Sequence, residues 1–362
     1  MKIIITANTA WNIYHFRYEL VKNLLKNNEV YVLSKRDDTS KKLISLGCKL
    51  INIDINQHGK NIFKELKLLY LFFINIKKIS PDILLSYTIK PNLYSGLICR
   101  LLKISNIVTI TGLGEVFLKE NIFKKIIIQF YKISIKKSSF VFFQNKNDLK
   151  YFKSLNIIKY NNVGIINGSG IKINKKKIKK IQNKYFTFLY IGRLIKEKGI
   201  HELIVSFKNL SRYKNRVKLV LIGSFYEQSF KQKILNQAKY NKNIIFKNFT
   251  KNVEFHIKKS DCIVLPSYRE GLPRSLLDGM NFSKPLIASN VPGCSELIKN
   301  GFNGYLCKKE DILSLEECMN KILNNKILYK MGNNGKKIIL PKYDIKITIQ
   351  KIIKKIHKIK KS

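Results

Sequence analysis

Short runs of β-branched and aromatic residues alternate along the chain with longer segments whose apolar residues recur every three or four positions. This alternation predicts parallel β-strands joined by amphipathic helices that cover both faces of a sheet. In the first half the predicted strands are Lys2–Thr6, Glu29–Leu33, Lys49–Ile53, Asp82–Ser86, Asn106–Ile110, Phe140–Phe143 and Val163–Asn167. In the second half they are Phe186–Ile191, Val217–Ile222, Asn243–Phe246, Asp261–Leu265 and Pro285–Ser289, with helices near Gly199–Leu210 and from Pro273.

The pattern stops once and then restarts, which divides the chain into two domains. Residues 171–184 are nearly all Lys, Ile and Asn without a clear period and form the predicted linker. We expect an N-terminal domain at residues 1–170, a C-terminal domain at 185–340 and a basic amphipathic helix at 341–362. The length of 362 residues agrees with two domains, since single cores usually stop growing at about 250–300 residues. The predicted fold class is α/β, with two doubly wound domains facing a cleft.

The chain is strongly basic, with 69 Lys and Arg against 23 Asp and Glu and a formal net charge of +46. Lys-rich surfaces bind nucleic acid through its phosphates, but no RNA-recognition signature, zinc-finger spacing or basic heptad array occurs. Only eight basic residues are Arg, and Lys, Ile and Asn are over-used throughout, as an AT-rich coding sequence would produce. Coding bias and an anionic partner both remain open, and we expect no specific nucleic-acid partner.

Three basic stretches carry apolar residues at helical spacing and favour contact with anionic lipid. They are residues 61–79, 117–138 and 349–361. Core-packed helices with solvated Lys faces explain the pattern equally well. The six Cys form no CxxC pair, and the chain opens without a charged-then-apolar signal segment. We therefore expect a reduced, cytoplasmic protein attached peripherally to the inner face of the plasma membrane.

The first candidate site residues follow the carboxyl end of the predicted strand Phe186–Ile191. Gly192 and Arg193 follow this strand, and Lys198 precedes a predicted helix start. Backbone amides at a helix N-terminus with two cations beside them suit a diphosphate. The spacing differs from the P-loop and the dinucleotide fingerprint, which disfavours ATP hydrolysis and NAD chemistry. Ordinary solvated charges remain the simpler alternative for these two cations.

A second group follows the strand Asp261–Leu265. Glu270 and Asp278 stand eight positions apart across a strand-to-helix turn, so Glu270 is expected at the strand edge and Asp278 one to two turns into the helix. The vicinal hydroxyls of a sugar nucleotide suit such carboxylates, and its phosphates suit free helix amides. A capping acid and a solvated helix acid are the alternative. No Asp-x-Asp pair or His/Cys cluster typical of a divalent-ion transferase occurs, so we expect no metal and no cofactor besides a nucleotide-sugar co-substrate.

Four motifs follow one another in the second half of the chain: GRLIKEKG at 192–199, YREGLPRSLLDGM at 268–280, VPGCSELI at 291–298 and GFNGYL at 301–306. At these residues the chain resembles the retaining family 4 glycosyltransferases, whose GT-B architecture has two Rossmann-like domains. IYHFR at 13–17, YTIKPN at 87–92 and TGLG at 111–114 resemble the members that build lipid-linked oligosaccharides, including the N-acetylgalactosaminyltransferase acting on diphosphoundecaprenyl-linked bacillosamine. The resemblance covers nearly the whole chain.

The resemblance implies retaining transfer of a HexNAc or hexose from a UDP-sugar to a polyprenyl-diphosphate-linked saccharide, by front-face attack. Arg193 and Lys198 would hold the donor diphosphate, and Glu270 would lie against the transferred sugar. The other donor-binding residues would be Gly192, Gly223, Gly271, Leu272 and Asp278. The acceptor-side candidates are Arg17, His15, Lys90, Thr111 and Gly112.

The chain departs from the family pattern at three places. Asp278 replaces a Glu and is one methylene shorter, so its ribose contact could become water-mediated. The residues Thr6–Trp11 replace a Gly-rich turn, and no His occurs at Thr111–Gly114, which puts a His-based acceptor contact there in doubt. His15 is a candidate substitute, with a structural role as the alternative. Sugar-nucleotide epimerases and phosphorylases share the architecture, and a non-enzymatic binder of anionic lipid or nucleic acid also stays open.

Overall fold

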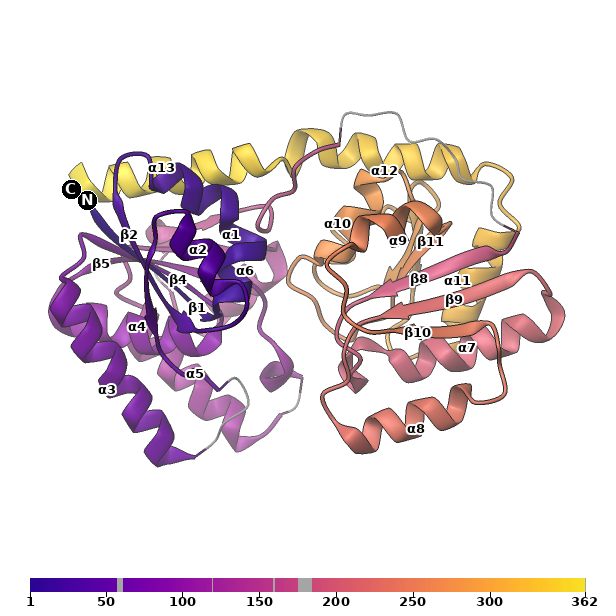
Figure 1. The fold of residues 1–362 in the computed structure, drawn as a ribbon, viewed down its shortest axis with the longest axis horizontal. Helices are drawn as coiled ribbons and strands as arrows, with labels where there is room; N and C mark the ends of the chain where they lie inside the picture. Colours follow the sequence, from indigo (N-terminus) through magenta and orange to yellow (C-terminus); the bar gives the residue numbers. More distant parts are fainter. Residues whose placement is uncertain (57–60, 119, 159, 175–183, 362) are drawn as a thin grey trace. The chain divides into compact units, whose positions relative to one another are not determined.

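The computed structural model describes residues 1–56, 61–118, 120–158, 160–174 and 184–361. The chain forms two compact units, Met1–Gly170 with Ile345–Ser362 and Ile171–Asp344, which Figure 1 shows as ribbons. Residues 175–183 of the predicted linker lie outside the described residues. Each unit contains a parallel sheet with helices on both faces, so the predicted α/β fold class is confirmed.

The described part of the N-terminal unit contains a seven-stranded sheet in the order β3-β2-β1-β4-β5-β6-β7. The strands are β1 (Lys2–Thr9), β2 (Glu29–Lys35), β3 (Lys49–Asn52), β4 (Ile83–Tyr87), β5 (Ser105–Ile110), β6 (Phe140–Phe143) and β7 (Val163–Ile165). Neighbouring strands are parallel, as where β1 pairs with β2 and β4. Successive side chains point to opposite faces, so Ile3 and Ile5 enter one core cluster and Ile4 another.

Helices cover both faces of this sheet (Figure 1). They are α1 (Ala10–Leu24), α2 (Ser40–Ser45), α3 (Ile62–Ile79), α4 (Ile89–Leu102), α5 (Ile122–Ile135), α6 (Lys146–Ser154) and α13 (Ile345–Lys361), with short 3-10 turns at Glu115–Phe117 and Tyr160–Asn162. Leu20 of α1 and Ile352 of α13 share one core cluster, whereas Phe72 of α3 and Cys99 of α4 share another.

The C-terminal basic stretch differs from its prediction. Helix α12 runs to Lys342 in the C-terminal unit and α13 begins at Ile345 in the N-terminal unit, so residue 341 lies inside a helix. Ile349, Ile352 and Ile356 of α13 are 9%, 4% and 1% exposed and pack against the sheet. The prediction that this apolar side contacts lipid is therefore wrong, because the protein core already covers it.

The described part of the C-terminal unit contains a six-stranded parallel sheet in the order β10-β9-β8-β11-β12-β13. The strands are β8 (Phe186–Ile191), β9 (Val217–Ile222), β10 (Ile244–Lys247), β11 (Cys262–Leu265), β12 (Leu286–Ser289) and β13 (Gly304–Cys307). The helices are α7 (Ile200–Tyr213), α8 (Gln228–Ala238), α9 (Val253–Lys259), α10 (Arg274–Asn281), α11 (Ile312–Leu323) and α12 (Leu328–Lys342), with the 3-10 turn η3 (Lys196–Lys198). One continuous apolar core includes residues from every strand.

Candidate functional site

The strand order of the C-terminal sheet reverses between β8 and β11, which are neighbours in the sheet. Strands β9 and β10 continue on one side of β8, whereas β12 and β13 continue on the other side of β11. Parallel α/β sheets bind ligands outside the carboxyl ends of their strands at such a reversal. The loops after β8 and β11 carry the two predicted groups of site residues, and the topology brings them to one edge.

Lys198 and Glu270 meet at this edge. Lys198 Nζ lies 2.5 Å from Glu270 Oε1, and the two side chains are 17% and 13% exposed. The backbone also ties the loops together, because the Tyr268 amide donates to the Glu197 carbonyl over 2.9 Å. A Cβ atom on Gly199 would lie 2.1 Å from the Pro266 carbonyl oxygen, so the close approach requires glycine there.

A buried tyrosine supports the turn that carries Arg193. Tyr190 is fully buried, and its hydroxyl donates to the Arg193 carbonyl over 2.7 Å. Burial raises the pKa of the Tyr190 phenol well above its ordinary value; the Glu270 carboxylate raises it further and the Arg193 guanidinium opposes both. The hydrogen bond from Tyr190 thus fixes the backbone of the turn that carries Arg193.

Gly192 directly follows β8 and Gly223 directly follows β9, and the backbones of the two glycines lie in close contact. A Cβ atom on Gly223 would lie 1.8 Å from the Gly192 carbonyl oxygen, and one on Gly192 would lie 2.8 Å from the Tyr190 hydroxyl. The turns continue side by side, since the Leu194 amide donates to the Ser224 carbonyl over 3.0 Å. A side chain at Gly223 would therefore collide with the turn after β8, and one at Gly192 would collide with the Tyr190 ring.

Asp278 lies in the second turn of α10, as the spacing predicted, but it already has a partner. Arg274 Nε lies 2.9 Å from Asp278 Oδ1, one helical turn earlier, and the Asp278 side chain is 23% exposed. Burial raises the pKa of the Asp278 carboxyl, and Arg274 opposes this shift. Gly271 is buried and Leu272 half-buried in the loop before α10. To accept a hydrogen bond from a ligand hydroxyl, the Asp278 carboxylate would have to use its second oxygen, or its contact with Arg274 would have to break.

Two residues near this site were not among the predicted site residues, although they lie in the VPGCSELI motif. A Cβ atom on Gly293 would lie 2.3 Å from the Gly271 carbonyl oxygen and 3.0 Å from that of Glu270. Cys294 is fully buried. Burial raises the pKa of its thiol, Glu270 raises it further and Lys198 opposes. The turn at residues 291–295 therefore packs against the loop that carries Glu270. No signal in the sequence indicates this contact between two separate segments.

The acceptor-side candidates lie on the N-terminal unit, and two of them are held by other side chains. Lys90 Nζ lies 2.5 Å from Glu65 Oε1. His15 stacks on Trp11 with ring centroids 4.5 Å apart, and its Nδ1 lies 3.1 Å from the Trp11 carbonyl oxygen. Thr111 and Gly112 follow β5 at the carboxyl edge and are half-buried.

Arg17 is the buried member of this group, with 6% exposure. Its guanidinium lies 4.1 Å from the Tyr87 ring centroid, and Nη1 donates to Asn12 Oδ1 over 2.6 Å. Burial lowers its pKa to about 10, and Tyr87 opposes this shift. Arg17 lines a small cavity of about 20 Å³ with residues of α13 such as Thr348 and Ile352. The structure therefore seats Arg17 under α13 rather than on the open surface.

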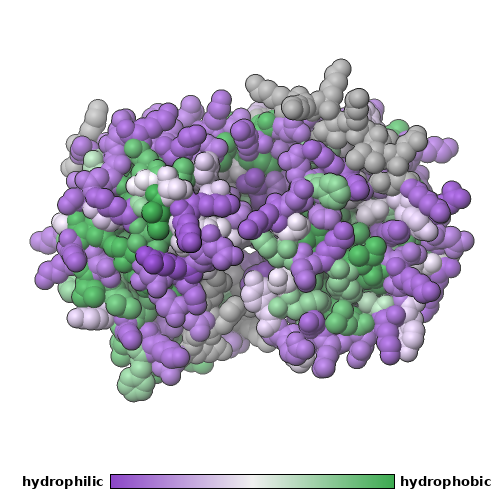
Figure 2. Space-filling view, viewed as in Figure 1, coloured by the Kyte–Doolittle hydropathy of each residue, from purple (hydrophilic) through white to green (hydrophobic). Residues whose placement is uncertain are grey.

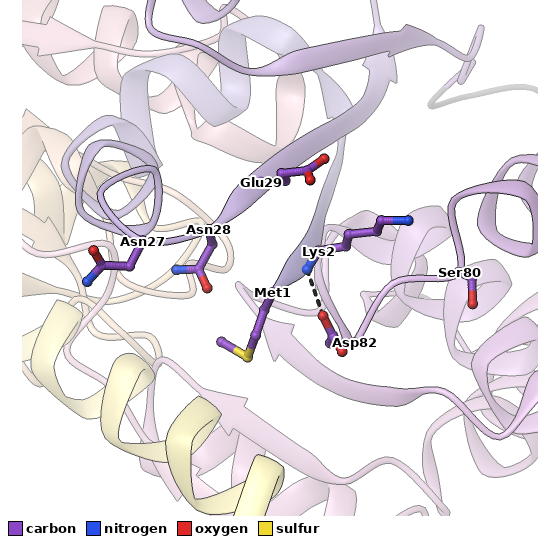
Figure 3. Close-up of a pocket in the computed structure, with 7 residues that line it drawn as sticks. All are labelled: Met1, Lys2, Asn27, Asn28, Glu29, Ser80 and Asp82. Atoms are coloured by element: carbon purple, nitrogen blue, oxygen red, sulfur yellow. Dashed lines mark hydrogen bonds between the residues drawn. The ribbon is translucent and has the colours of Figure 1, made fainter.

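A shallow pocket of about 550 Å³ lies away from all these residues. Figure 3 shows its lining, which comes from the amino ends of β1 and β2 and the segment before β4: Met1, Lys2, Asn27, Asn28, Glu29, Ser80 and Asp82. The Lys2 amide donates to Asp82 Oδ2 over 2.7 Å. This is the amino edge of the sheet, opposite the edge where parallel sheets bind ligands, and it holds none of the predicted residues.

Two family models match most of the chain. The model of glycosyl transferases group 1 matches residues 171–338, and a glycosyl transferase 4-like model matches residues 2–145. An uncharacterized glycosyltransferase of Methanocaldococcus jannaschii is 30% identical over 314 residues, which are 80% of this chain and 78% of that protein. This chain belongs to the group 1 glycosyltransferases of family 4.

This glycosyltransferase also has relatives over its full length. The N,N'-diacetylbacillosaminyl-diphospho-undecaprenol alpha-1,3-N-acetylgalactosaminyltransferase of Campylobacter jejuni is 26% identical over 376 residues, 98% of both chains. The crystal structure of Anabaena HepE in complex with UDP and glucose superposes with a TM-score of 0.81 at 16% identity, over 98% of both chains. This likeness confirms the predicted GT-B fold.

The described residues contain no group of three or more His, Cys, Asp and Glu side chains placed to hold a metal ion. In the same residues, no helix combines the length and the apolar character needed to cross a bilayer.

Proposed function

We propose that this glycosyltransferase moves a HexNAc or hexose from a UDP-sugar to a polyprenyl-diphosphate-linked saccharide, with retention of anomeric configuration, in bacterial surface polysaccharide or glycan biosynthesis. The observation that carries the proposal is the meeting of Lys198 and Glu270 at the strand-order reversal, beside the turn of Arg193. The full-length similarity to a transferase named for a diphospho-undecaprenol acceptor supports the acceptor class.

The donor fits the charges of the C-terminal unit. A diphosphate needs cations and amide donors, and Arg193 and Lys198 supply the cations. Helix α10 begins directly after Pro273, and the amide groups at a helix N-terminus are suited to binding an anion. Glu270 would accept from hydroxyls of the transferred sugar and Asp278 from the ribose. Gly192, Gly223, Gly271 and Leu272 would line the nucleotide with backbone groups.

The reaction needs charge stabilisation more than a nucleophilic side chain. The bond from the sugar C1 to the β-phosphate oxygen breaks, and a bond from C1 to the acceptor oxygen forms on the same face. The acceptor proton passes to the departing phosphate oxygen, so the step balances without a further reactant. Lys198 and Arg193 would stabilise the negative charge that grows on the phosphate, and each preorganised donor of this kind contributes about 2.7–4 kcal/mol.

The acceptor would approach the N-terminal unit from a membrane. Helix α5 exposes Ile122, Ile126, Phe130 and Ile133 by 72%, 44%, 43% and 50%, with the exposed Lys125, Lys136 and Lys137 around them. Helix α3 exposes Phe63 and Leu66 by 83% and 58%, and Figure 2 shows hydrophobic residues at the surface where Figure 1 places this helix. Apolar side chains flanked by Lys suit an anionic lipid surface.

The test is transfer by the purified protein. UDP-GalNAc, UDP-GlcNAc, UDP-Gal and GDP-Man would be offered with polyprenyl-diphosphate saccharides, and products identified by mass spectrometry and by the anomeric signal in NMR. We expect one UDP-sugar to give a retained product, and we expect Glu270→Gln to abolish transfer. Glu254→Gln is the matched control, because Glu254 pairs with Lys258 over 2.6 Å at the surface, with side chains 56% and 45% exposed.

Two results would contradict the proposal. One is the absence of transfer from every sugar nucleotide to every lipid-linked acceptor. The other is acceptor-independent conversion of one UDP-sugar into its epimer, which would make the protein an epimerase of the same architecture.

A further inference from the structure

The backbone at Thr88 adopts a conformation that is unusual for a residue with a side chain. Its φ and ψ are 70° and 159°, in a region occupied almost only by glycine. Thr is β-branched, which makes the conformation still less favourable. Ser80 at 47° and 65° and Lys103 at 56° and 33° also have positive φ, but they end helices in the ordinary left-handed region. Thr88 is therefore held in place by its surroundings.

The Thr88 hydroxyl forms one of these restraints. It donates to Asn8 Oδ1 over 3.0 Å and also contacts the Tyr87 carbonyl oxygen. Although Thr88 is the N-cap of α4, its side chain makes no bond to that helix. Thr9, the N-cap of α1, by contrast accepts from the Asn12 amide in the usual way. The Thr88 hydroxyl thus joins the turn after β4 to Asn8 in β1 instead of capping its own helix.

This hydrogen bond lies where the strand order of the N-terminal sheet reverses. Strands β1 and β4 are neighbours, with β2 and β3 on one side and β5, β6 and β7 on the other. Asn8 near the end of β1 and Thr88 directly after β4 are half-buried at the carboxyl edge, the edge at which parallel sheets take up ligands. The first turn of α4, which begins at Ile89, follows directly.

We propose that Thr88 is a positioning residue for the acceptor: its strained backbone, locked by Asn8, fixes the entry to α4 at the acceptor-binding edge. This inference rests on the proposed function, because it takes the acceptor to bind the N-terminal unit. A ligand-binding turn held in one geometry avoids the loss of rate that follows from small displacements.

Thr88→Gly tests both parts of the inference. Glycine tolerates this backbone, so we expect the melting temperature to rise by about 2–4 °C. The hydrogen bond from the Thr88 hydroxyl to Asn8 is lost at the same time. We therefore expect the acceptor KM to rise about tenfold or more, with the donor KM unchanged. Asn8→Ala removes the hydrogen bond alone and is expected to raise the acceptor KM without raising the melting temperature.

Ser80→Gly is the matched control, because Ser80 also has positive φ but lines the pocket at the amino edge. Its kinetic constants are expected to equal those of the wild type. An unchanged acceptor KM in Thr88→Gly, or a lowered melting temperature, would overturn the role of Thr88. A wild-type protein that transfers no sugar would instead contradict the proposed function, so the two failures are distinguishable.

Discussion

Lys198 Nζ and Glu270 Oε1 lie 2.5 Å apart, and both side chains are less than one-fifth exposed, at 17% and 13%. The cation proposed for the donor phosphate and the carboxylate proposed for the donor sugar therefore pair with each other. A donor that enters must offer phosphate oxygens to Lys198 and hydroxyls to Glu270 in exchange. This exchange keeps each charge paired before and after binding, which avoids the cost of a buried lone charge.

Removal of both partners should cost less stability than the sum of the two single removals. In Lys198→Ala the Glu270 carboxylate keeps its largely buried place without a cation, so we expect a loss of about 1–3 kcal/mol in the free energy of unfolding. The double variant with Glu270→Ala should be destabilised by less than the sum of the single variants. Urea unfolding of the four proteins measures this coupling, and additive effects would show that the pair does not act as a unit.

Gly293→Ala should damage the site through Glu270. A methyl group there would lie 2.3 Å from the Gly271 carbonyl oxygen, so the Glu270–Gly271 loop must move, and we expect transfer to fall by about 100-fold or more. Gly301→Ala is the matched control, because Gly301 also has positive φ, at 75°, but has no atom within 4 Å of the added carbon. It should cost about 1–2 kcal/mol of stability and keep wild-type activity. Equal activity of both variants would contradict the support assigned to Gly293.

The raised pKa of Asp278 predicts a pH dependence of stability. Because the folded state holds this proton to higher pH than the unfolded chain, the protonated form contributes stability at low pH that is lost as the pH rises through the folded-state pKa. Asp278→Asn does not titrate. The unfolding free energy of this variant relative to the wild type should therefore increase from pH 4 to pH 7. A difference that falls over this range would contradict a raised pKa.

The exposed stripe of α5 should govern membrane binding. Phe130→Ser removes an apolar side chain whose full burial would contribute about 1.5–3 kcal/mol, so we expect roughly tenfold weaker binding to vesicles containing phosphatidylglycerol. The melting temperature should not change, because Phe130 is 43% exposed. Leu313→Ser in α11 is the control, with Leu313 75% exposed on the C-terminal unit. Equal vesicle binding by both variants in a flotation assay would contradict the role of α5.

The strands were predictable because apolar β-branched runs mark them directly. The predicted bounds Phe140–Phe143, Phe186–Ile191 and Val217–Ile222 agree with β6, β8 and β9. Strand β13, Gly304–Cys307, was not predicted, since it is short, begins with glycine and follows a polar turn. The sequence predicted a division between residues 340 and 341, and the structure ends α12 at Lys342 and begins α13 at Ile345. The packing of α13 on the N-terminal unit was not predicted, because its apolar spacing does not show which sheet it covers.

The sequence could predict that the loops carrying the candidate site residues lie at one edge of the sheet, because the carboxyl ends of parallel strands share an edge. The roles assigned to the site residues remain predictions. Pairings between distant segments could not be inferred, such as that of Lys90 with Glu65, 25 residues earlier on another helix. The support of Glu270 by Gly293 likewise depends on how β11 and β12 place their loops. The Arg274–Asp278 pair was within reach, because its spacing of four in a predicted helix is a known stabilising pattern.

A crystal structure of the protein with bound UDP tests the central claim most directly. The diphosphate is predicted to lie within hydrogen-bonding distance of Lys198 Nζ and the Arg193 guanidinium, with Glu270 facing the position of the sugar. UDP bound at another edge of the C-terminal sheet, or with its phosphates turned away from both cations, would contradict the account.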